Sequence, residues 1–439
     1  MSANWTNRTM WTGDNLDVMR GMNSDSVDLI YLDPPFNSSR AYEAPIGSEA
    51  AGAAFKDSWT LDEIDLAWHG EIADREPALY AVIDAAGTAH SKSMKAYAVM
   101  MTVRLLEMRR ILKPTGSIYL HCDPTASHYL KLAMDAVFGQ ANFRNEIVWS
   151  HQGSWIQPGK RYPRRHDTIL YYSKSEKLTF NIQYEDNAQE QVNYKRWRKY
   201  IEADNCIYGR NMPSHDKRFA SYLKRFRKEH GREPEENDVV HRLTGSRIGT
   251  VQYVKVVDPK SPEKIGYPTQ KPIALLKRIV KASSNEGDMV LDPFAGCAAA
   301  CVAAEKMGRQ WVAIDLSPKA AELVKIRAEK ELTGLLSSMG GTKYAITHRT
   351  DIPKRTDLGK LPNYRTHKHL LFGKQEGLCA GCRAMFPFRN FTIDHIVPRS
   401  RGGSDHEENL QLLCAACNSL KGGRPQEFML AELKRQGVL

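Results

Sequence analysis

The stretch Leu29-Ile30-Tyr31-Leu32-Asp33-Pro34-Pro35-Phe36 decides the fold that we expect for this chain. Its apolar run ends abruptly in an acid, two prolines and an aromatic ring. Because proline cannot continue a sheet ladder, the run predicts a buried strand that stops at Asp33. Open α/β sheets bind ligands at such strand ends, and a carboxylate beside a ring suits a flat nitrogenous base. The alternative is a plain turn after a buried strand.

The neighbouring segments predict helices and strands in alternation. Patterns of apolar residues predict helices at 92–112, 126–138 and 273–282, and strands at 117–121, 146–149 and 168–172. Residues 37–75 are irregular, and we expect them to form a mobile loop over the site. The alternation is typical of a doubly wound, mostly parallel α/β sheet.

A second strand end follows much later, at Met289-Val290-Leu291-Asp292-Pro293-Phe294-Ala295-Gly296. A glycine-bearing turn leads into an alanine-rich helix, and the next predicted strand ends at Asp315. Nucleoside-binding folds place an acid about 20 residues beyond such a turn, where it holds the ribose hydroxyls. This second strand end is therefore a candidate nucleoside site.

Composition and charge limit the class of protein. The formal net charge is +11 over 439 residues, which favours a polyanionic partner such as nucleic acid. The mean hydropathy is −0.50, and neither a long apolar run nor a signal-peptide core is present. We therefore expect a cytoplasmic protein, associated with the nucleoid through DNA, with no membrane partner.

Basic and aromatic side chains concentrate between residues 191 and 232. Basic groups neutralise phosphates and aromatic rings pack or stack, so this stretch predicts an insert that contacts a nucleic-acid duplex. The alternative is a solvated pair of amphipathic helices.

The paired strand ends resemble those of the DNA amino-methyltransferases, the N6-adenine and N4-cytosine family, in the permuted order of its beta class. The resemblance covers roughly residues 8–330 and includes Leu112-Lys113-Pro114 and the run from Tyr267 to Pro272. It implies S-adenosylmethionine as cofactor and a base flipped out of double-stranded DNA. One departure is Ala298, which stands where the family's turn has a second glycine, a change that puts cofactor affinity in doubt.

The resemblance also implies roles for individual residues. It implies that Asp292, Phe294 and Gly296 bind the methionine part of the cofactor, that Asp315 binds its ribose and that Asp14 binds its adenine. The catalytic group comprises Asp33, Pro34, Pro35 and Phe36. Asp33 and the Pro34 carbonyl bind the exocyclic amine, and Phe36 stacks on the base. An acid before the prolines leans towards adenine rather than cytosine.

The carboxyl-terminal part contains two C-x-x-C pairs, Cys379 with Cys382 and Cys414 with Cys417. In a cytosolic protein this arrangement predicts one tetrahedral zinc site that staples a small domain. Together with Asp394-His395, the spacing resembles the four-cysteine HNH endonucleases, with a ββα-metal fold, over roughly residues 366–425. The resemblance implies His395 as general base, Asp394 and Asn418 as ligands of Mg²⁺ or a similar ion, and Asn409 as a residue that orients the base or its loop.

These observations predict three segments: a methyltransferase domain at 1–335 with a target-recognition insert at about 180–265, a linker at 336–365, and an HNH domain at 366–439. The leading hypothesis is a DNA methyltransferase fused to a nuclease, as in a single-chain restriction-modification or phage-related enzyme. One alternative is a methyltransferase whose HNH-like domain only binds DNA, and another is a regulator that binds without turnover. Whether the enzyme is a homodimer stays open at this stage.

Overall fold

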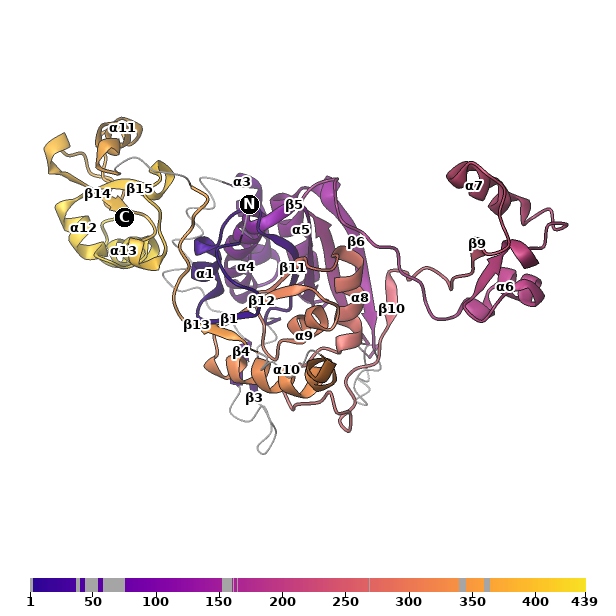
Figure 1. The fold of residues 1–439 in the computed structure, drawn as a ribbon. Coiled ribbons are helices and arrows are strands. Elements are labelled where there is room, and N and C mark those ends of the chain that lie inside the picture. The colour runs from indigo at the N-terminus through magenta and orange to yellow at the C-terminus, as the bar shows by residue number, and fades with distance from the viewer. Residues whose placement is uncertain are drawn as a thin grey trace. The chain divides into compact units, whose positions relative to one another are not determined.

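The computed structural model describes residues 3–36, 40–43, 54–57, 76–151, 160, 162–163, 165–267, 269–338, 345–358 and 364–439. Its centre is a nine-stranded sheet in the order β10-β6-β7-β5-β2-β11-β12-β1-β13 (Figure 1). Six strands pair in parallel: β1 (Thr9–Thr12), β2 (Val27–Leu32), β5 (Leu112–Cys122), β11 (Met289–Asp292), β12 (Gln310–Asp315) and β13 (Thr347–Arg349). The strands β6 (Phe143–Ser150) and β7 (His166–Ser173) are antiparallel, and β10 spans Val251–Tyr253.

The two strand ends found in the sequence are neighbours in this sheet. Strand β11 pairs in parallel with β2, with Val290 opposite Leu29 and Leu291 opposite Ile30. Both strands therefore end at the same edge, which brings Asp33 and Asp292 together although they are far apart along the chain. The prediction of a mostly parallel α/β sheet is confirmed.

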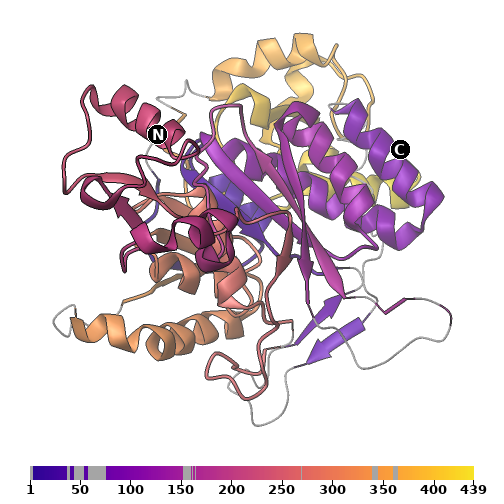
Figure 2. The same cartoon turned by 90° about the vertical axis from the view of Figure 1, so that its right-hand side faces the viewer.

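Helices cover both faces of the sheet (Figure 2). Side chains alternate between the faces, as strand geometry requires: Ile30 and Leu32 lie in one apolar core, whereas Leu29 and Tyr31 lie in the other. The first core includes residues of α1 (Asn15–Gly21), α3 (Pro77–Ala89), α4 (Lys92–Ile111) and α5 (Ser127–Phe138). The second includes residues of α8 (Ile273–Ser283), α9 (Ala299–Glu305) and α10 (Pro318–Ser338).

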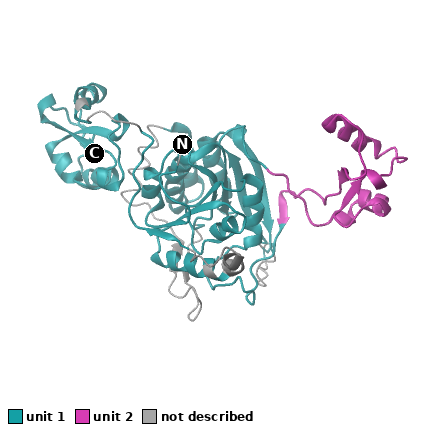
Figure 3. Ribbon diagram, viewed as in Figure 1, with its two compact units in different colours: residues 1–180, 253–439 teal, residues 181–252 magenta. Residues whose placement is uncertain are grey.

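Residues 181–252 form a compact unit of their own, within the predicted insert at 180–265 (Figure 3). The unit contains α6 (Val192–Trp197), β8 (Cys206–Tyr208), α7 (Ala220–His230) and β9 (Val239–Arg242). Its aromatic residues are largely internal: Trp197 and Phe219 are buried in its core, and Tyr222 stacks on His241 with ring centroids 3.8 Å apart. The aromatic rings of this unit thus mainly hold it together.

The small carboxyl-terminal domain has a ββα core. Strands β14 (Phe391–His395) and β15 (Leu410–Cys414) form an antiparallel pair, and α12 (Ala415–Lys421) follows directly. Its remaining helices are α11 (Lys368–Lys374) and α13 (Gln426–Arg435). Apart from the cysteines, this domain has a small buried core, which includes Phe391, Leu412, Leu413 and Met429.

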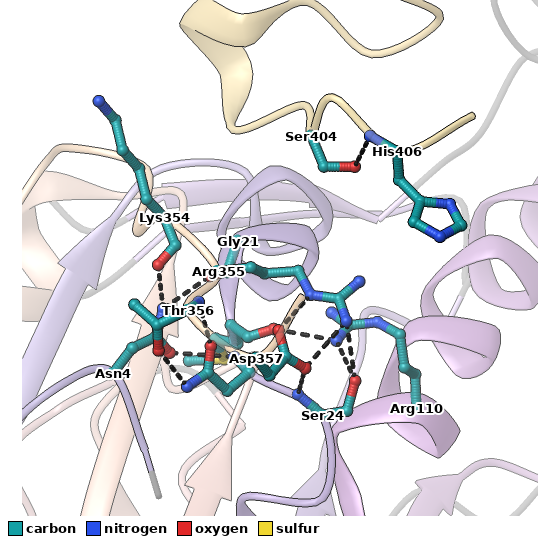
Figure 4. Close-up of polar contacts among 12 residues, drawn as sticks. Asn4, Gly21, Ser24, Arg110, Lys354, Arg355, Thr356, Asp357, Ser404 and His406 are labelled. Carbon is teal, nitrogen blue, oxygen red and sulfur yellow. Dashed lines mark hydrogen bonds and ion pairs between the residues drawn. The ribbon is translucent and has the colours of Figure 1, made fainter. Parts of the chain in front are cut away.

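The sheet continues past residue 335, where we predicted the methyltransferase domain to end. Strand β13 pairs with β1, and the following residues hydrogen-bond to the loop after α1 and to Asn4, which precedes β1 (Figure 4). The Ser24 backbone N–H donates to Asp357 Oδ2 at 2.8 Å, and Asn4 Nδ2 donates to the Lys354 carbonyl at 2.7 Å. Burial acts to raise the pKa of Asp357, but hydrogen bonds from Arg355 and Ser24 outweigh it and hold that pKa well below its usual value. Side-chain bonding of this kind leaves no periodic pattern in the sequence.

The predicted helices and strands are otherwise close to the observed ones. Within the expected irregular segment at 37–75, β3 (Arg40–Glu43) and β4 (Ala54–Asp57) form an antiparallel pair. The rest of the mobile loop proposed there lies outside the described residues. Among the described residues, no helix is long and apolar enough to cross a membrane.

Candidate active site and metal centre

A cavity of about 570 Å³ lies where β2, β11 and β12 end. All nine residues that the resemblance assigned to the methyltransferase site line it: Asp14, Asp33, Pro34, Pro35, Phe36, Asp292, Phe294, Gly296 and Asp315. The structure therefore brings the catalytic and the cofactor motifs into a single cavity.

Asp33 has one bound and one unbound carboxylate oxygen. Its Oδ2 accepts a hydrogen bond from Lys271 Nζ at 2.6 Å, and the two side chains are only 18% and 8% exposed. Its Oδ1 is buried and has no hydrogen-bond partner among the residues that the structure describes. Buried polar atoms are nearly always satisfied, so a buried acceptor without a partner, on a residue that lines a cavity, indicates a site for a donor.

The side chain of Phe36 lies beside this carboxylate. Lys271 Nζ is 5.1 Å from the centroid of the Phe36 ring, and the His121 ring is 5.7 Å away at a tilt of 32°. His121 is fully buried between Tyr31 Oη at 2.9 Å and Asp167 Oδ2 at 3.2 Å. Burial, followed by the charge of Asp33, raises the pKa of Tyr31 well above its usual value, so the phenol stays neutral. His121 on β5 and Asp167 on β7 therefore hold in place the ring that packs against Phe36.

The cofactor half is built from the turn after β11 and the end of β12. The Gly296 backbone N–H donates to Asp315 Oδ2 and the Ser317 backbone N–H to Asp315 Oδ1, both at 2.8 Å. Gly296 has a φ of +49°, and a Cβ there would lie 3.1 Å from the Tyr267 ring. Glycine is needed at this position both for its conformation and for the space.

Two acids of this half are deeply buried. Burial raises the pKa of Asp292 well above its usual value, and the charges of Asp33 and Asp315 add to the effect. Burial likewise raises the pKa of Asp315, although hydrogen bonds from Ser317 and Gly296 act against it. Both carboxyls would be ionised more easily with a cation beside them.

The charges that line the cavity favour a cationic ligand. The lining contains four carboxylates, Asp14, Asp33, Asp292 and Asp315, and two cations, Arg104 and Lys271. Arg104 is already engaged with Asp14 at 2.9 Å and with Asn15 at 2.6 Å. S-adenosylmethionine carries a sulfonium and an ammonium against one carboxylate, so its net charge suits this surplus of acid.

Ala298 occupies the position where we expected a second glycine. Its φ is +54° and its ψ is +42°, so the left-handed conformation is kept despite the side chain. The residue is fully buried in the core beneath α9 and is not among the residues that line the cavity. The methyl therefore packs into the core and takes no space from the cavity.

The four cysteines of the carboxyl-terminal domain converge as predicted. The sulfur atoms of Cys379, Cys382, Cys414 and Cys417 all lie within 4.8 Å of one another. Four thiolates at this separation match a closed tetrahedral zinc site. Within the described part of the chain, this is the one group of three or more His, Cys, Asp and Glu side chains that lie close enough together to hold a metal ion.

The predicted nuclease residues lie on and around β14. His395 Nε2 is 2.8 Å from Asp405 Oδ1, and Asp394 Oδ2 accepts from the buried Lys421 at 2.9 Å. Asn409 braces the loop after β14, since its side chain bonds both the N–H and the carbonyl of Val397, at 2.8 and 3.1 Å. Asn418 is half-buried on α12.

Several residues that line the cavity were not among the predicted site residues, and Lys271, Tyr31 and Arg104 are the ones with a charged or phenolic group next to the predicted acids. Lys271 follows Thr269, whose φ of +61° is rare for a β-branched residue and marks a strained turn. The run from Tyr267 to Pro272 was noticed in the sequence, but nothing in it shows that its lysine meets an acid 238 residues away.

Comparison with known proteins decides the family. A family model described as DNA methylase, of the N6/N4 type, matches residues 27–326. The chain belongs to this DNA methylase family. A model for HNH endonucleases matches residues 379–424, so the methylase carries a carboxyl-terminal HNH domain.

Individual relatives of the methylase are distant. It is 28% identical over 327 residues to the type III restriction-modification enzyme StyLTI Mod subunit of Salmonella typhimurium, a match that covers 65% of this chain and 48% of that protein. It is 26% identical over 347 residues to the DNA adenine methyltransferase YhdJ of Escherichia coli. That match covers 75% of this chain and 90% of YhdJ. Among solved structures, the PvuII DNA methyltransferase (cytosine-N4-specific) aligns with 12% identity and a TM-score of 0.40 over 74% of this chain and 93% of that one.

Proposed function

We propose that the methylase transfers the methyl group of S-adenosylmethionine to the exocyclic amine of a base flipped out of double-stranded DNA, with N6 of adenine favoured over N4 of cytosine. The observation that carries the proposal is Asp33 Oδ1, a buried acceptor that finds no partner among the described residues, on a side chain that lines the same cavity as the cofactor motif. The preference for adenine is supported by the acid before Pro34 and by the naming of YhdJ as an adenine methyltransferase.

The residues present account for the chemistry that such a transfer needs. When bound, S-adenosylmethionine supplies an electrophilic methyl group on a positively charged sulfur. An aryl amine is a poor nucleophile because its lone pair is delocalised into the ring. Hydrogen bonds from the amine to Asp33 Oδ1 and the Pro34 carbonyl favour a tetrahedral nitrogen, and stacking on Phe36 holds the base. Positioning and local electrostatics then carry the rate.

The insert is the part that we assign to target recognition. Its basic side chains are exposed, among them Lys195, Arg196, Arg198, Lys199, Lys217, Arg218, Lys224 and Arg225. Exposed cations of this density suit contacts to DNA phosphates, which position a protein on a duplex.

For the HNH domain we propose metal-dependent cleavage or nicking of DNA. His395 has one ring nitrogen beside Asp405, which leaves Nδ1 to take a proton from water. Asp394 and Asn418 would hold Mg²⁺ through oxygen atoms, as this hard ion prefers. Zn²⁺ on the four cysteines would supply stability that so small a core lacks. The alternative is a zinc-stapled domain that only binds DNA.

The test is transfer of labelled methyl groups from S-adenosylmethionine to duplex DNA by the whole chain. We expect Asp33→Ala to lose transfer but to keep any cleavage, and absence of labelling by the unaltered enzyme on diverse duplex DNA contradicts the proposal. Methylome sequencing of DNA from cells that express the chain identifies the base and its sequence context. Cleavage assays with Mg²⁺ on methylated and unmethylated DNA distinguish an HNH domain that cuts DNA from one that only binds it.

A further inference from the structure

Lys271 occupies an unusual place in the cavity, next to the carboxylate that is expected to bind the target amine. Its ammonium is 2.6 Å from Asp33 Oδ2 and 3.4 Å from the Thr269 carbonyl, and its side chain is 8% exposed. An ammonium has three N–H donors. One of these bonds to Asp33 and the long contact to Thr269 engages a second, which leaves a third donor without a partner among the described residues.

Asp33 and Lys271 therefore present an acceptor and a donor side by side. The acceptor is Asp33 Oδ1, which is buried and has no partner in the described part of the chain. The donor is Lys271 Nζ, which the Oδ2 contact holds beside the same carboxylate. Both residues line the cavity, and Lys271 Nζ lies 5.1 Å from the Phe36 ring centroid, within reach of a base stacked on that ring.

This pair complements one edge of two of the four bases. Adenine and cytosine each carry an amine next to a ring nitrogen with a free lone pair, which is a donor beside an acceptor. Guanine and thymine carry at the matching positions a carbonyl next to a ring N–H, so both would face the pair with the wrong polarity. Flipped bases are read through this Watson–Crick edge.

We propose that Lys271 is a specificity residue that donates a hydrogen bond to the ring nitrogen beside the target amine, N1 of adenine or N3 of cytosine. This inference rests on the proposed amino-methyl transfer and adds to it how the base is selected. In the absence of DNA, Lys271 also holds Oδ2 of the Asp33 carboxylate, which leaves Oδ1 as the oxygen without a partner among the described residues. A buried polar site of this kind rejects analogues that lack the matching group.

The experiment compares adenine with 1-deazaadenine, in which a C–H replaces the ring nitrogen. Each base is placed in the recognition sequence opposite an abasic site, so that loss of Watson–Crick pairing does not enter the comparison. Single-turnover methyl transfer should be about 10- to 100-fold slower on the analogue with the unaltered enzyme, as expected for a hydrogen bond to a charged group. If the methylated base is cytosine, 3-deazacytosine takes the place of the analogue.

Variants then assign the effect to Lys271. In Lys271→Met the ratio of the two rates should fall to near one, whereas in Lys113→Met it should stay as in the unaltered enzyme. Lys113 is a matched control because it pairs with Asp28 at 2.8 Å outside the cavity lining. Lys271→Arg, which keeps a cationic donor, should keep part of the discrimination.

Each outcome is decisive. If the unaltered enzyme methylates no duplex at all, the proposed function fails. If it methylates adenine and 1-deazaadenine equally fast, the inference about Lys271 fails while the proposed function stands, and this holds even where Lys271→Met does not fold. A ratio that persists in a folded Lys271→Met variant also overturns it.

Discussion

Asp33→Ala is expected to affect stability as well as catalysis, because it leaves the Lys271 ammonium buried without its carboxylate. Lys271 is 8% exposed and its ion pair is 2.6 Å long, so the pair belongs to the buried class. Removing one partner of such a pair typically costs about 3–5 kcal/mol, whereas replacing both with apolar groups is close to neutral. We take the lower value, about 3 kcal/mol, because the pair borders a cavity that water can enter.

The assay is thermal unfolding of the methyltransferase domain in the whole chain. For a domain of over 200 residues, 3 kcal/mol corresponds to a fall of roughly 6 °C in the midpoint. The double variant Asp33→Ala/Lys271→Met should regain most of this loss but no methyl transfer. Asp84→Ala, which breaks the surface Lys95–Asp84 pair where Asp84 is 52% exposed, is the control and should cost less than about 1 kcal/mol. If the double variant is no more stable than Asp33→Ala, the reasoning about the buried charge is refuted.

Three other predictions concern the metal centre, the nuclease and the cofactor. Cys417→Ser should lose bound zinc and open residues 364–439 to proteolysis while methyl transfer persists; equal protease resistance would exclude a structural metal. His395→Ala should abolish Mg²⁺-dependent cleavage without changing methylation, and unaltered cutting would refute its role as base. The raised pKa values of Asp292 and Asp315 mean that these carboxyls take up protons in the unliganded fold at a higher pH than in the unfolded chain. Affinity for S-adenosylmethionine should therefore fall as the pH drops through the range above 3.8, and binding there should release protons, which calorimetry in buffers of different ionisation enthalpy measures; proton-neutral binding would contradict this.

The sequence predicts the scaffold well because the scaffold depends on short-range patterns. The run that ends at Asp33 and the run that ends at Asp292 are strands since apolar residues fill them, and the prolines after each stop the ladder. The resemblance to the amino-methyltransferases then implies that the two motifs share one site, and β2 and β11 do pair. The zinc site can be predicted equally well from the two cysteine pairs, because metal ligands come at fixed spacing. The bonds of residues 355–357 to the loop after α1 cannot be predicted in this way, since single side-chain contacts have no period.

The same distinction explains the two places where the cavity differs from expectation. Lys271 gains its position from a turn with a strained Thr269, and its partner Asp33 arrives from the other end of the domain, so the pair exists only in three dimensions. Ala298 is the opposite case, because the sequence draws attention to it and the structure shows that it lies outside the cavity lining. In the sequence it stands out as a residue that replaces a glycine of the family's turn. The left-handed conformation does carry a penalty of roughly 1–2 kcal/mol for alanine. The buried methyl offsets part of that penalty, since it packs in the core shared by α9 and the sheet and leaves the cavity open. What the turn requires is the backbone path at Gly296, where a side chain would meet Tyr267, and that glycine is present.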